Sequence, residues 1–339
     1  MVIALSMGVV FYNLFANYRQ KQYRVQYELL KSGITAYLKG DIAKSTLKGL
    51  VLVHQECLTS VLAQVAQTAS KADRHKLIDI LVECESTVVV DKELRQLNVG
   101  NWHERLNAAT YLPFIAHIET IKEPLLSALK DEFLDVRIAA ANSLAQLGVV
   151  AAIKPILINL ALEGTWPVQR LIEIIGQFDV DAIPHLKAYL EDSHASHPGR
   201  QVAIASLGII KGEASVAFLK KLSNDESVDI RVWVYRSLGQ LEYPSALPAL
   251  LIGIKDSAWE VRATCAKALK HFAGEQSIDS LQKGMGDSVW WVRLNCATSL
   301  MAMGAPGKLA LEKMNHSPDQ FVRDMSQMTL SQNTNKGVA

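Results

Sequence analysis

One sequence pattern recurs along this chain at an almost constant interval. In Asp256–Phe272 (DSAWEVRATCAKALKHF) the arginine of a Val-Arg pair, Arg262, is followed seven residues later by Leu269. The same offset recurs at Arg105/Leu112, Arg137/Leu144, Arg200/Leu207, Arg231/Leu238, Arg293/Leu300 and Arg323/Leu330, while Val168 and Ile175 fill the one gap. The eight apolar anchors therefore lie 30 to 32 residues apart. This period is typical of a solenoid, in which each unit buries its apolar face against its neighbours.

Each unit divides into two predicted helices. The first helix carries Val-Arg-x-x-Ala-x-x-x-Leu, as in Val136–Leu144, and its apolar residues form one buried stripe. The second helix often begins near a proline, where the missing N–H costs nothing: Pro124, Pro155, Pro184 and Pro248. We therefore predict an all-α fold, a right-handed α-solenoid of about eight helix pairs whose second helices line an extended concave surface.

An aspartate stands six residues before the anchor arginine in four of the units. The resulting ladder is Asp131, Asp225, Asp256 and Asp287 with Arg137, Arg231, Arg262 and Arg293. We interpret it as structural, with each arginine bonded to loop carboxylates of its own or the next unit. The order Asp-x-x-x-x-Val-Arg-x-x-Ala-x-x-x-Leu resembles that of bacterial HEAT-repeat proteins, in the short form of phycobilisome-lyase-type repeats, over about residues 101–330.

The chain begins with an apolar run, Val2–Ala16, followed by Arg19, Lys21 and Arg24. A cleaved signal peptide, a buried core helix and a membrane anchor are the three interpretations. The run lacks a leading positive charge and a clear small-residue cleavage site, and an all-round apolar core helix is unusual at a chain end. Tyrosines and basic residues after the run favour an anchor. We therefore predict a membrane helix over residues 1–18, with the solenoid on the cytoplasmic side of the inner membrane.

The rest of the domain organisation follows from where the repeat is regular. We expect a helical region of degenerate repeats or a cap over residues 19–100, HEAT-like repeats over 101–330 and a polar tail over 331–339. Glycine and serine mark expected breaks at Gly40-Asp41 and Ser70-Lys71.

Charge and cysteine usage exclude some functions. The 35 basic and 34 acidic side chains leave no basic surplus, which disfavours nucleic-acid binding. Cys57, Cys84, Cys265 and Cys296 form no C-x-x-C pair, and we interpret them as small core residues. We expect no cofactor and no metal.

Two segments of the chain contain histidines close to acidic residues. Asp192, His194 and His197 could approach a metal together, but loop histidines are more often solvated. The His103-Glu104 pair resembles one half of the repeated His-Glu pairs in iron-binding HEAT-repeat hydroxylases, but it occurs once, so the resemblance does not extend to that activity.

Tryptophans recur at the entry to the first helices. Trp102, Trp259 and Trp290 lie three residues before an anchor arginine, and Trp166 and Trp291 lie within a residue of that place. Each could cover an inter-repeat turn, or the row could bind a partner, since aromatic anchors dominate interface energetics. The candidate partner-binding residues are Trp102, Trp166, Trp259 and Trp291, with Trp291 expected to be the most exposed.

The resemblance and the anchor together predict a non-catalytic, membrane-tethered scaffold that binds a protein partner, such as a membrane-associated enzyme or signalling protein. The alternatives are a phycobilin-lyase-like or other HEAT-fold enzyme or chaperone, and a structural spacer. A spacer predicts that no aromatic patch is exposed.

Overall fold

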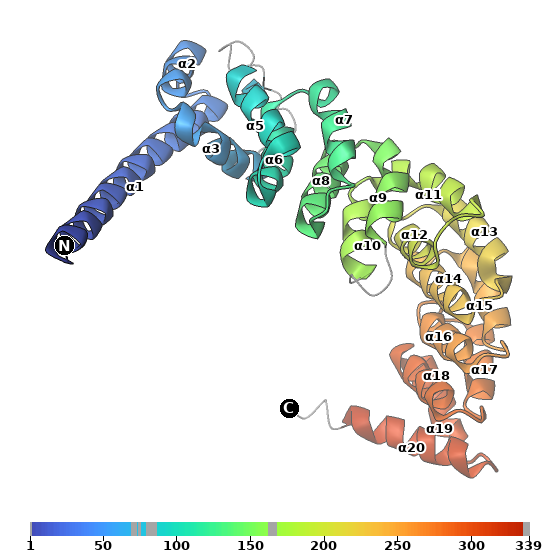
Figure 1. The fold of residues 1–339 in the computed structure, drawn as a ribbon. Helices are drawn as coiled ribbons and strands as arrows, with labels where there is room; N and C mark the ends of the chain where they lie inside the picture. Colours follow the sequence, from blue (N-terminus) through green and yellow to red (C-terminus); the bar gives the residue numbers. More distant parts are fainter. Residues whose placement is uncertain (1, 69–72, 74–75, 79–86, 162–167, 335–339) are drawn as a thin grey trace. The chain divides into compact units, whose positions relative to one another are not determined.

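The chain folds into helices joined by short turns. The computed structural model describes residues 2–68, 73, 76–78, 87–161 and 168–334, and every regular element in these ranges is helical (Figure 1). The chain divides into two compact units, Met1–Val149 (unit 1) and Val150–Ala339 (unit 2). The all-α, helical-repeat part of the fold prediction is therefore confirmed.

Unit 1 contains the N-terminal helix and the first regular repeats. Its described helices are α1 (Val2–Lys39), α2 (Lys44–Val53), α3 (Gln55–Thr68), α5 (Thr87–Val99), α6 (Trp102–Ile115), α7 (Ile118–Ala128) and α8 (Leu134–Gln146). Helix α1 ends where Gly40 adopts a φ of +87°, a conformation that glycine adopts without a steric penalty. The predicted break at Gly40-Asp41 is thus present, while the break expected at Ser70-Lys71 lies outside the described residues.

The predicted membrane helix is wrong. Residues 2–18 belong to α1, which continues without interruption to Lys39. The C-terminal half of α1 is packed within unit 1, where Leu30 and Ile34 are buried. Across the described part of the chain, none of the helices combines the length and the apolar character that crossing a bilayer requires. The apolar run, Val2–Ala16, is shorter than the roughly 20 residues of a span. The predicted placement at the inner membrane rested on that anchor and is wrong for the same reason.

Unit 2 alternates first helices, which carry the anchor residue, with second helices. The first helices are α10 (Val168–Gly176), α12 (His197–Ile209), α14 (Val228–Leu241), α16 (Trp259–Leu269), α18 (Trp290–Ala302) and α20 (Gln320–Thr334). The second helices are α9 (Ile153–Leu160), α11 (Ala182–Glu191), α13 (Glu213–Lys221), α15 (Leu247–Gly253), α17 (Glu275–Gly284) and α19 (Ala305–Met314). Four 3-10 turns adjoin them: η1 (Val150–Ala152), η2 (Asp179–Asp181), η3 (Leu222–Asn224) and η4 (Pro244–Ala246).

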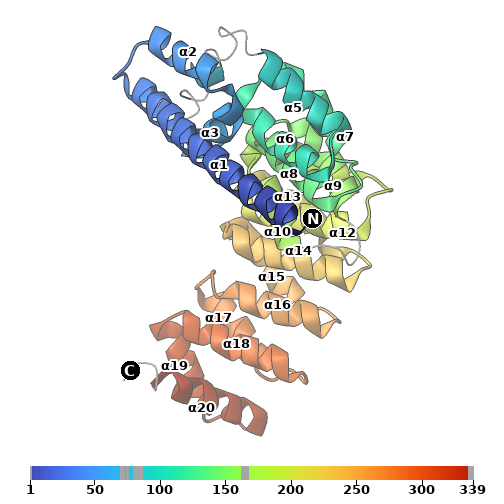
Figure 2. The ribbon, with the colours of Figure 1, turned by 60° about the vertical axis from the view of Figure 1, so that its left-hand side comes forward.

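The first helices of unit 2 pack side by side as a stack, which Figure 2 shows for α14, α16 and α18. The predicted anchors Leu207, Leu238, Leu269 and Leu300 are all fully buried. Small side chains bring neighbouring first helices close together: the Ser237 hydroxyl donates to the Ile204 carbonyl at 2.9 Å, across the α12–α14 contact. Within unit 2, the first helices lie on the inner side of the curve and the second helices on the outer side (Figure 1). The prediction that second helices line the concave side is therefore wrong, because the closely packed layer is the inner one.

Candidate functional site

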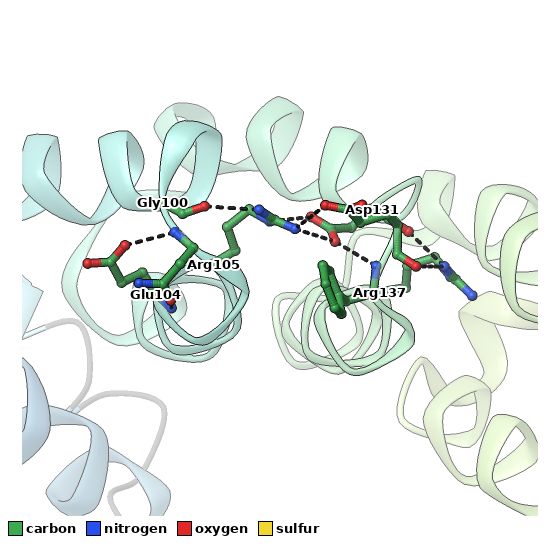
Figure 3. Close-up of polar contacts among 8 residues, drawn as sticks. Gly100, Glu104, Arg105, Asp131 and Arg137 are labelled. Carbon is green, nitrogen blue, oxygen red and sulfur yellow. Dashed lines mark hydrogen bonds and ion pairs between the residues drawn. The ribbon is translucent and has the colours of Figure 1, made fainter.

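At four places in the described structure, an arginine–aspartate pair joins one repeat to the next. In unit 1, Arg105 Nε donates to Asp131 Oδ2 at 2.7 Å, and its Nη1 donates to the Gly100 carbonyl at 2.9 Å (Figure 3). Asp131 Oδ1 also accepts the Phe133 N–H at 2.9 Å, at the start of its own first helix. The arginine thus holds its own loop through a carbonyl and the following repeat through a carboxylate.

The same geometry repeats in unit 2. Arg231 donates twice to Asp256, at 2.9 and 2.9 Å, and Arg262 donates twice to Asp287, at 2.7 and 3.0 Å. Arg200 donates a single hydrogen bond, from Nη2 to Asp225 Oδ2. Burial alone would raise the pKa of Asp256 and of Asp287, but hydrogen bonds from the arginines and from backbone N–H groups outweigh it and lower both pKa values. These carboxylates are already hydrogen-bonded within the protein, which is consistent with a structural role.

Two ladder arginines have different surroundings. Arg137 and Arg293 donate to the carbonyls of Asp131 and Asp287, at 2.7 and 2.8 Å. Among the described residues, neither forms an ion pair with a carboxylate; the Arg293 guanidinium instead lies 5.0 Å from the centre of the Phe321 ring. Where Val168 replaces the anchor arginine, the carboxylate of Asp192 binds Lys154 Nζ at 2.8 Å.

Trp102 is half-buried in unit 1. Its ring stacks on His103, with centroids 3.4 Å apart, and on Phe133 of the next repeat, at 5.8 Å. This geometry matches the interpretation in which a tryptophan covers an inter-repeat turn. Trp166 lies outside the described residues.

In unit 2, by contrast, three successive first helices expose aromatic rings where each helix begins. The exposed fractions are 38% for Trp259, 43% for Trp290, 54% for Trp291 and 65% for Phe321. Trp290 and Trp291 contact each other edge to face at 4.7 Å. We call Trp259, Trp290, Trp291 and Phe321 the aromatic row. Trp291 is the most exposed tryptophan of the row, as expected.

Phe321 was not among the residues singled out from the sequence. It lies two residues before Arg323, just as Trp291 lies two residues before Arg293. A search for any aromatic residue at this offset, rather than for tryptophan alone, would have found it. Trp233 stands outside the row, with the Arg236 guanidinium 4.6 Å from its ring centre.

The structure does not bring the histidine cluster together. Asp192 binds Lys154, while His197 Nε2 lies 3.1 Å from the Gln201 side chain and 3.9 Å from Asp229. Glu104 is a helix cap: it accepts the Asn101 N–H at 2.8 Å, and Asn101 accepts the Glu104 N–H in return. Within the described ranges, no group of three or more His, Cys, Asp or Glu side chains is arranged to hold a metal ion.

Cys57, Cys265 and Cys296 are buried free thiols, and Cys84 lies outside the described residues. Burial, with a smaller contribution from Asp287, raises the pKa of Cys296 to about 12. Burial also raises the pKa of Cys265 well above its ordinary value. Both side chains are therefore neutral packing groups at physiological pH, since the thiolate is the reactive form.

The comparisons with known proteins agree with the repeat fold. The family model of HEAT repeats matches residues 183–258 and 247–331. Residues 183–331 of the chain therefore match HEAT repeats. No curated protein matches it.

Several solved structures are similar to the chain. The complex of CpcE and CpcF of phycocyanin lyase from Nostoc sp. PCC7120 shows 23% identity over 45% of this chain and 99% of that chain, with a TM-score of 0.36. Human deoxyhypusine hydroxylase in complex with glycerol shows 18% identity over 83% and 97%, with a TM-score of 0.33. A structure of Kap95p with RanGDP shows 12% identity over 90% and 50%, with a TM-score of 0.47.

Proposed function

We propose that this chain is a non-catalytic scaffold that binds a protein partner through the aromatic row of unit 2. The observation that carries the proposal is the exposure of Trp259, Trp290, Trp291 and Phe321 on neighbouring first helices. Large apolar side chains that gather on a surface mark interaction sites, whereas apolar residues exposed singly need no explanation. A structural spacer that binds no partner does not require exposed aromatic side chains.

The rings of the row suit a binding surface for a further reason. Tryptophan is enriched among the residues that dominate binding energy, because it buries a large apolar area when a partner excludes water. The four rings come from α16, α18 and α20, whose packing on one another fixes the helix backbones that carry the rings. A partner would therefore meet a preorganised surface and lose little additional conformational entropy on the scaffold side.

The non-catalytic part of the proposal is supported by where the reactive groups are used. Glu104 caps a helix, Asp192 is paired with Lys154, and the thiols of Cys265 and Cys296 are buried and protonated. The ladder aspartates are bonded to arginines. Lyase-like or chaperone activity would have to use other groups.

The test is a comparison of partner capture by three forms of the full chain from an extract of its native organism. The forms are the wild type, a row variant (Trp259→Ala, Trp291→Ala, Phe321→Ala) and a matched control. The control (Val180→Ala, Ile252→Ala, Leu309→Ala) removes side chains that are also exposed but lie outside the row. We expect a stoichiometric protein partner with the wild type and the control, and its loss with the row variant.

The variants must remain folded if a loss of capture is to reflect the loss of the aromatic row. Each substitution of an exposed residue should change the free energy of unfolding by less than about 0.5 kcal/mol, measured by chemical denaturation. A loss of about 3 kcal/mol or more for Trp291→Ala would show that its ring is part of the core and would contradict the proposal. Equal capture by the row variant and the wild type, or no partner with any form, would also overturn it.

A further inference from the structure

We propose that the partner segment bound by the aromatic row is a cationic, extended peptide with arginine or lysine at about every third position. This inference rests on the proposed function, since it names the partner of the same surface. It follows from the charge of the segments that carry the row.

Four segments each directly precede an anchor arginine, and the row lies within the last three of them. They are residues 225–230 (DESVDI), 256–261 (DSAWEV), 287–292 (DSVWWV) and 317–322 (SPDQFV). The ladder bonds and the stacking of α14, α16, α18 and α20 place successive segments next to one another. We call these segments the acidic edge, because together they contain seven carboxylates and no lysine, arginine or histidine: Asp225, Glu226, Asp229, Asp256, Glu260, Asp287 and Asp319.

Three of these carboxylates are neutralised within the protein. Asp225, Asp256 and Asp287 are paired with the arginines of the preceding repeats. Of the others, Asp229 has a 73% exposed side chain and lies 3.9 Å from His197, which carries charge only when protonated. In the part of the chain that the structure describes, Glu226, Glu260 and Asp319 form no ion pair.

The cations near the edge cancel only part of this surplus. Arg231 and Arg262 are paired with Asp256 and Asp287, whereas Arg293 and Arg323 donate to backbone carbonyls at the start of their own segments and pair with no carboxylate in the described structure. Exposed Lys255 directly precedes one segment and exposed Asp324 follows shortly after another, so these flanking charges offset each other. Four carboxylates without an arginine or lysine partner, against these two arginines, leave the edge with a net negative charge beside exposed aromatic rings.

Carboxylates and aromatic faces recognise the same kind of ligand. A guanidinium or ammonium group is attracted to the negative face of an aromatic ring and forms charge-assisted hydrogen bonds with carboxylates. The protein already uses this contact at the edge, where the Arg293 guanidinium lies 5.0 Å from the centre of the Phe321 ring. A phosphate-rich ligand would be repelled by the same carboxylates.

The spacing of the repeats sets the spacing of the cations. Packed neighbouring helices lie about 8–10 Å apart, and an extended peptide advances roughly 3.3 Å per residue. One repeat therefore corresponds to about three residues of a bound peptide. A segment with a basic residue at every third position presents one cation to each repeat along the edge.

The test uses the full chain and a labelled peptide of repeated Arg-Gly-Ser units, long enough to cover four repeats, with binding followed by fluorescence anisotropy. We expect a charge variant (Glu226→Gln, Asp229→Asn, Glu260→Gln) and the row variant each to raise Kd roughly tenfold. A control variant (Glu213→Gln, Glu275→Gln) removes exposed carboxylates of second helices and should bind like the wild type. Increasing salt should weaken binding to the wild type more than to the charge variant.

Two further peptides complete the test. A Glu-Gly-Ser peptide should not bind, and a peptide of the same composition with its arginines clustered at one end should bind several-fold more weakly. Equal binding of the clustered or the acidic peptide, or unchanged binding by the charge variant, would overturn the inference. If the charge variant still captures the partner from the extract while the row variant does not, the row remains a docking surface and only the cationic partner is excluded.

Discussion

At the scale of single residues, the ladder aspartates are shared between two repeats. Asp256 accepts two hydrogen bonds from Arg231 of the preceding repeat and one from the Ala258 N–H of its own helix, at 2.8 Å. The side chains of Arg231 and Asp256 are only 12% and 14% exposed. Removing the carboxylate leaves a largely buried guanidinium without its charged partner, which costs more than an exposed ion pair contributes.

We expect Asp256→Ala to lower the free energy of unfolding by about 2–3 kcal/mol, because it removes the charge-assisted hydrogen bonds from Arg231 together with the acceptor for the Ala258 N–H in the turn before α16. Asp319 provides a matched control. It accepts the Phe321 N–H at 2.8 Å but pairs with no arginine in the described structure. Asp319→Ala should therefore cost only about 1 kcal/mol. Equal losses in the two variants, measured by urea denaturation, would show that the Arg231 contact adds nothing.

At the scale of helices, two second helices of unit 2 approach the following first helices closely because a glycine on the one faces a cysteine on the other. An added Cβ at Gly284, the last residue of α17, would overlap Cys296 Sγ in α18, and an added Cβ at Gly253 would overlap Cys265 Sγ and the Tyr235 ring. The pairing recurs in two consecutive repeats. It explains why a small thiol, rather than a larger apolar group, is buried at these positions.

Gly284→Ala should destabilise the protein by about 1–3 kcal/mol, because the packed core cannot absorb the extra methyl group. Cys296→Ala removes the sulfur that the methyl group would meet. The double variant should therefore recover part of the loss, giving a favourable coupling energy in a double-mutant cycle measured by thermal denaturation. Strictly additive losses would mean that the two residues do not compete for the same space.

At the scale of the whole molecule, the chain is a linear array whose stability depends on contacts between neighbours. In unit 2, the first helices α12, α14, α16 and α18 each pack on the first helix before and the first helix after. The last helix, α20, covers α18 and α19 and buries Val322 and Met325 against them. The effect of losing α20 should therefore be local.

A chain that ends at Asn315 lacks α20. We expect amide hydrogen exchange to become faster in α18 and α19, which lose their cover, and to remain unchanged in α14, which packs on α12 and α16. The full-length chain is the reference, and mass spectrometry gives the exchange of each helix. Faster exchange throughout unit 2 would show that the unit unfolds as one cooperative domain rather than repeat by repeat.

The sequence by itself determined the repeat, the helix pairs and the arginine–aspartate ladder. These features depend on short-range periodicity: Leu269 and Asp287 lie at fixed distances along the chain from Arg262, and the helical repeat turns those distances into burial and pairing. The N-terminal prediction failed because composition alone does not show that one helix continues from the apolar run to Lys39.

Only the tertiary structure decided which helices line the inner side of unit 2 and which aromatic rings remain exposed. Trp102 and Trp259 lie at the same offset from their anchor arginines, but Trp102 is covered by Phe133 of the next repeat. The residue at the equivalent place after Trp259 is the smaller Val289, and Trp259 stays exposed. The exposure of a ring therefore depends on a side chain about 30 residues away, which only packing between repeats brings near.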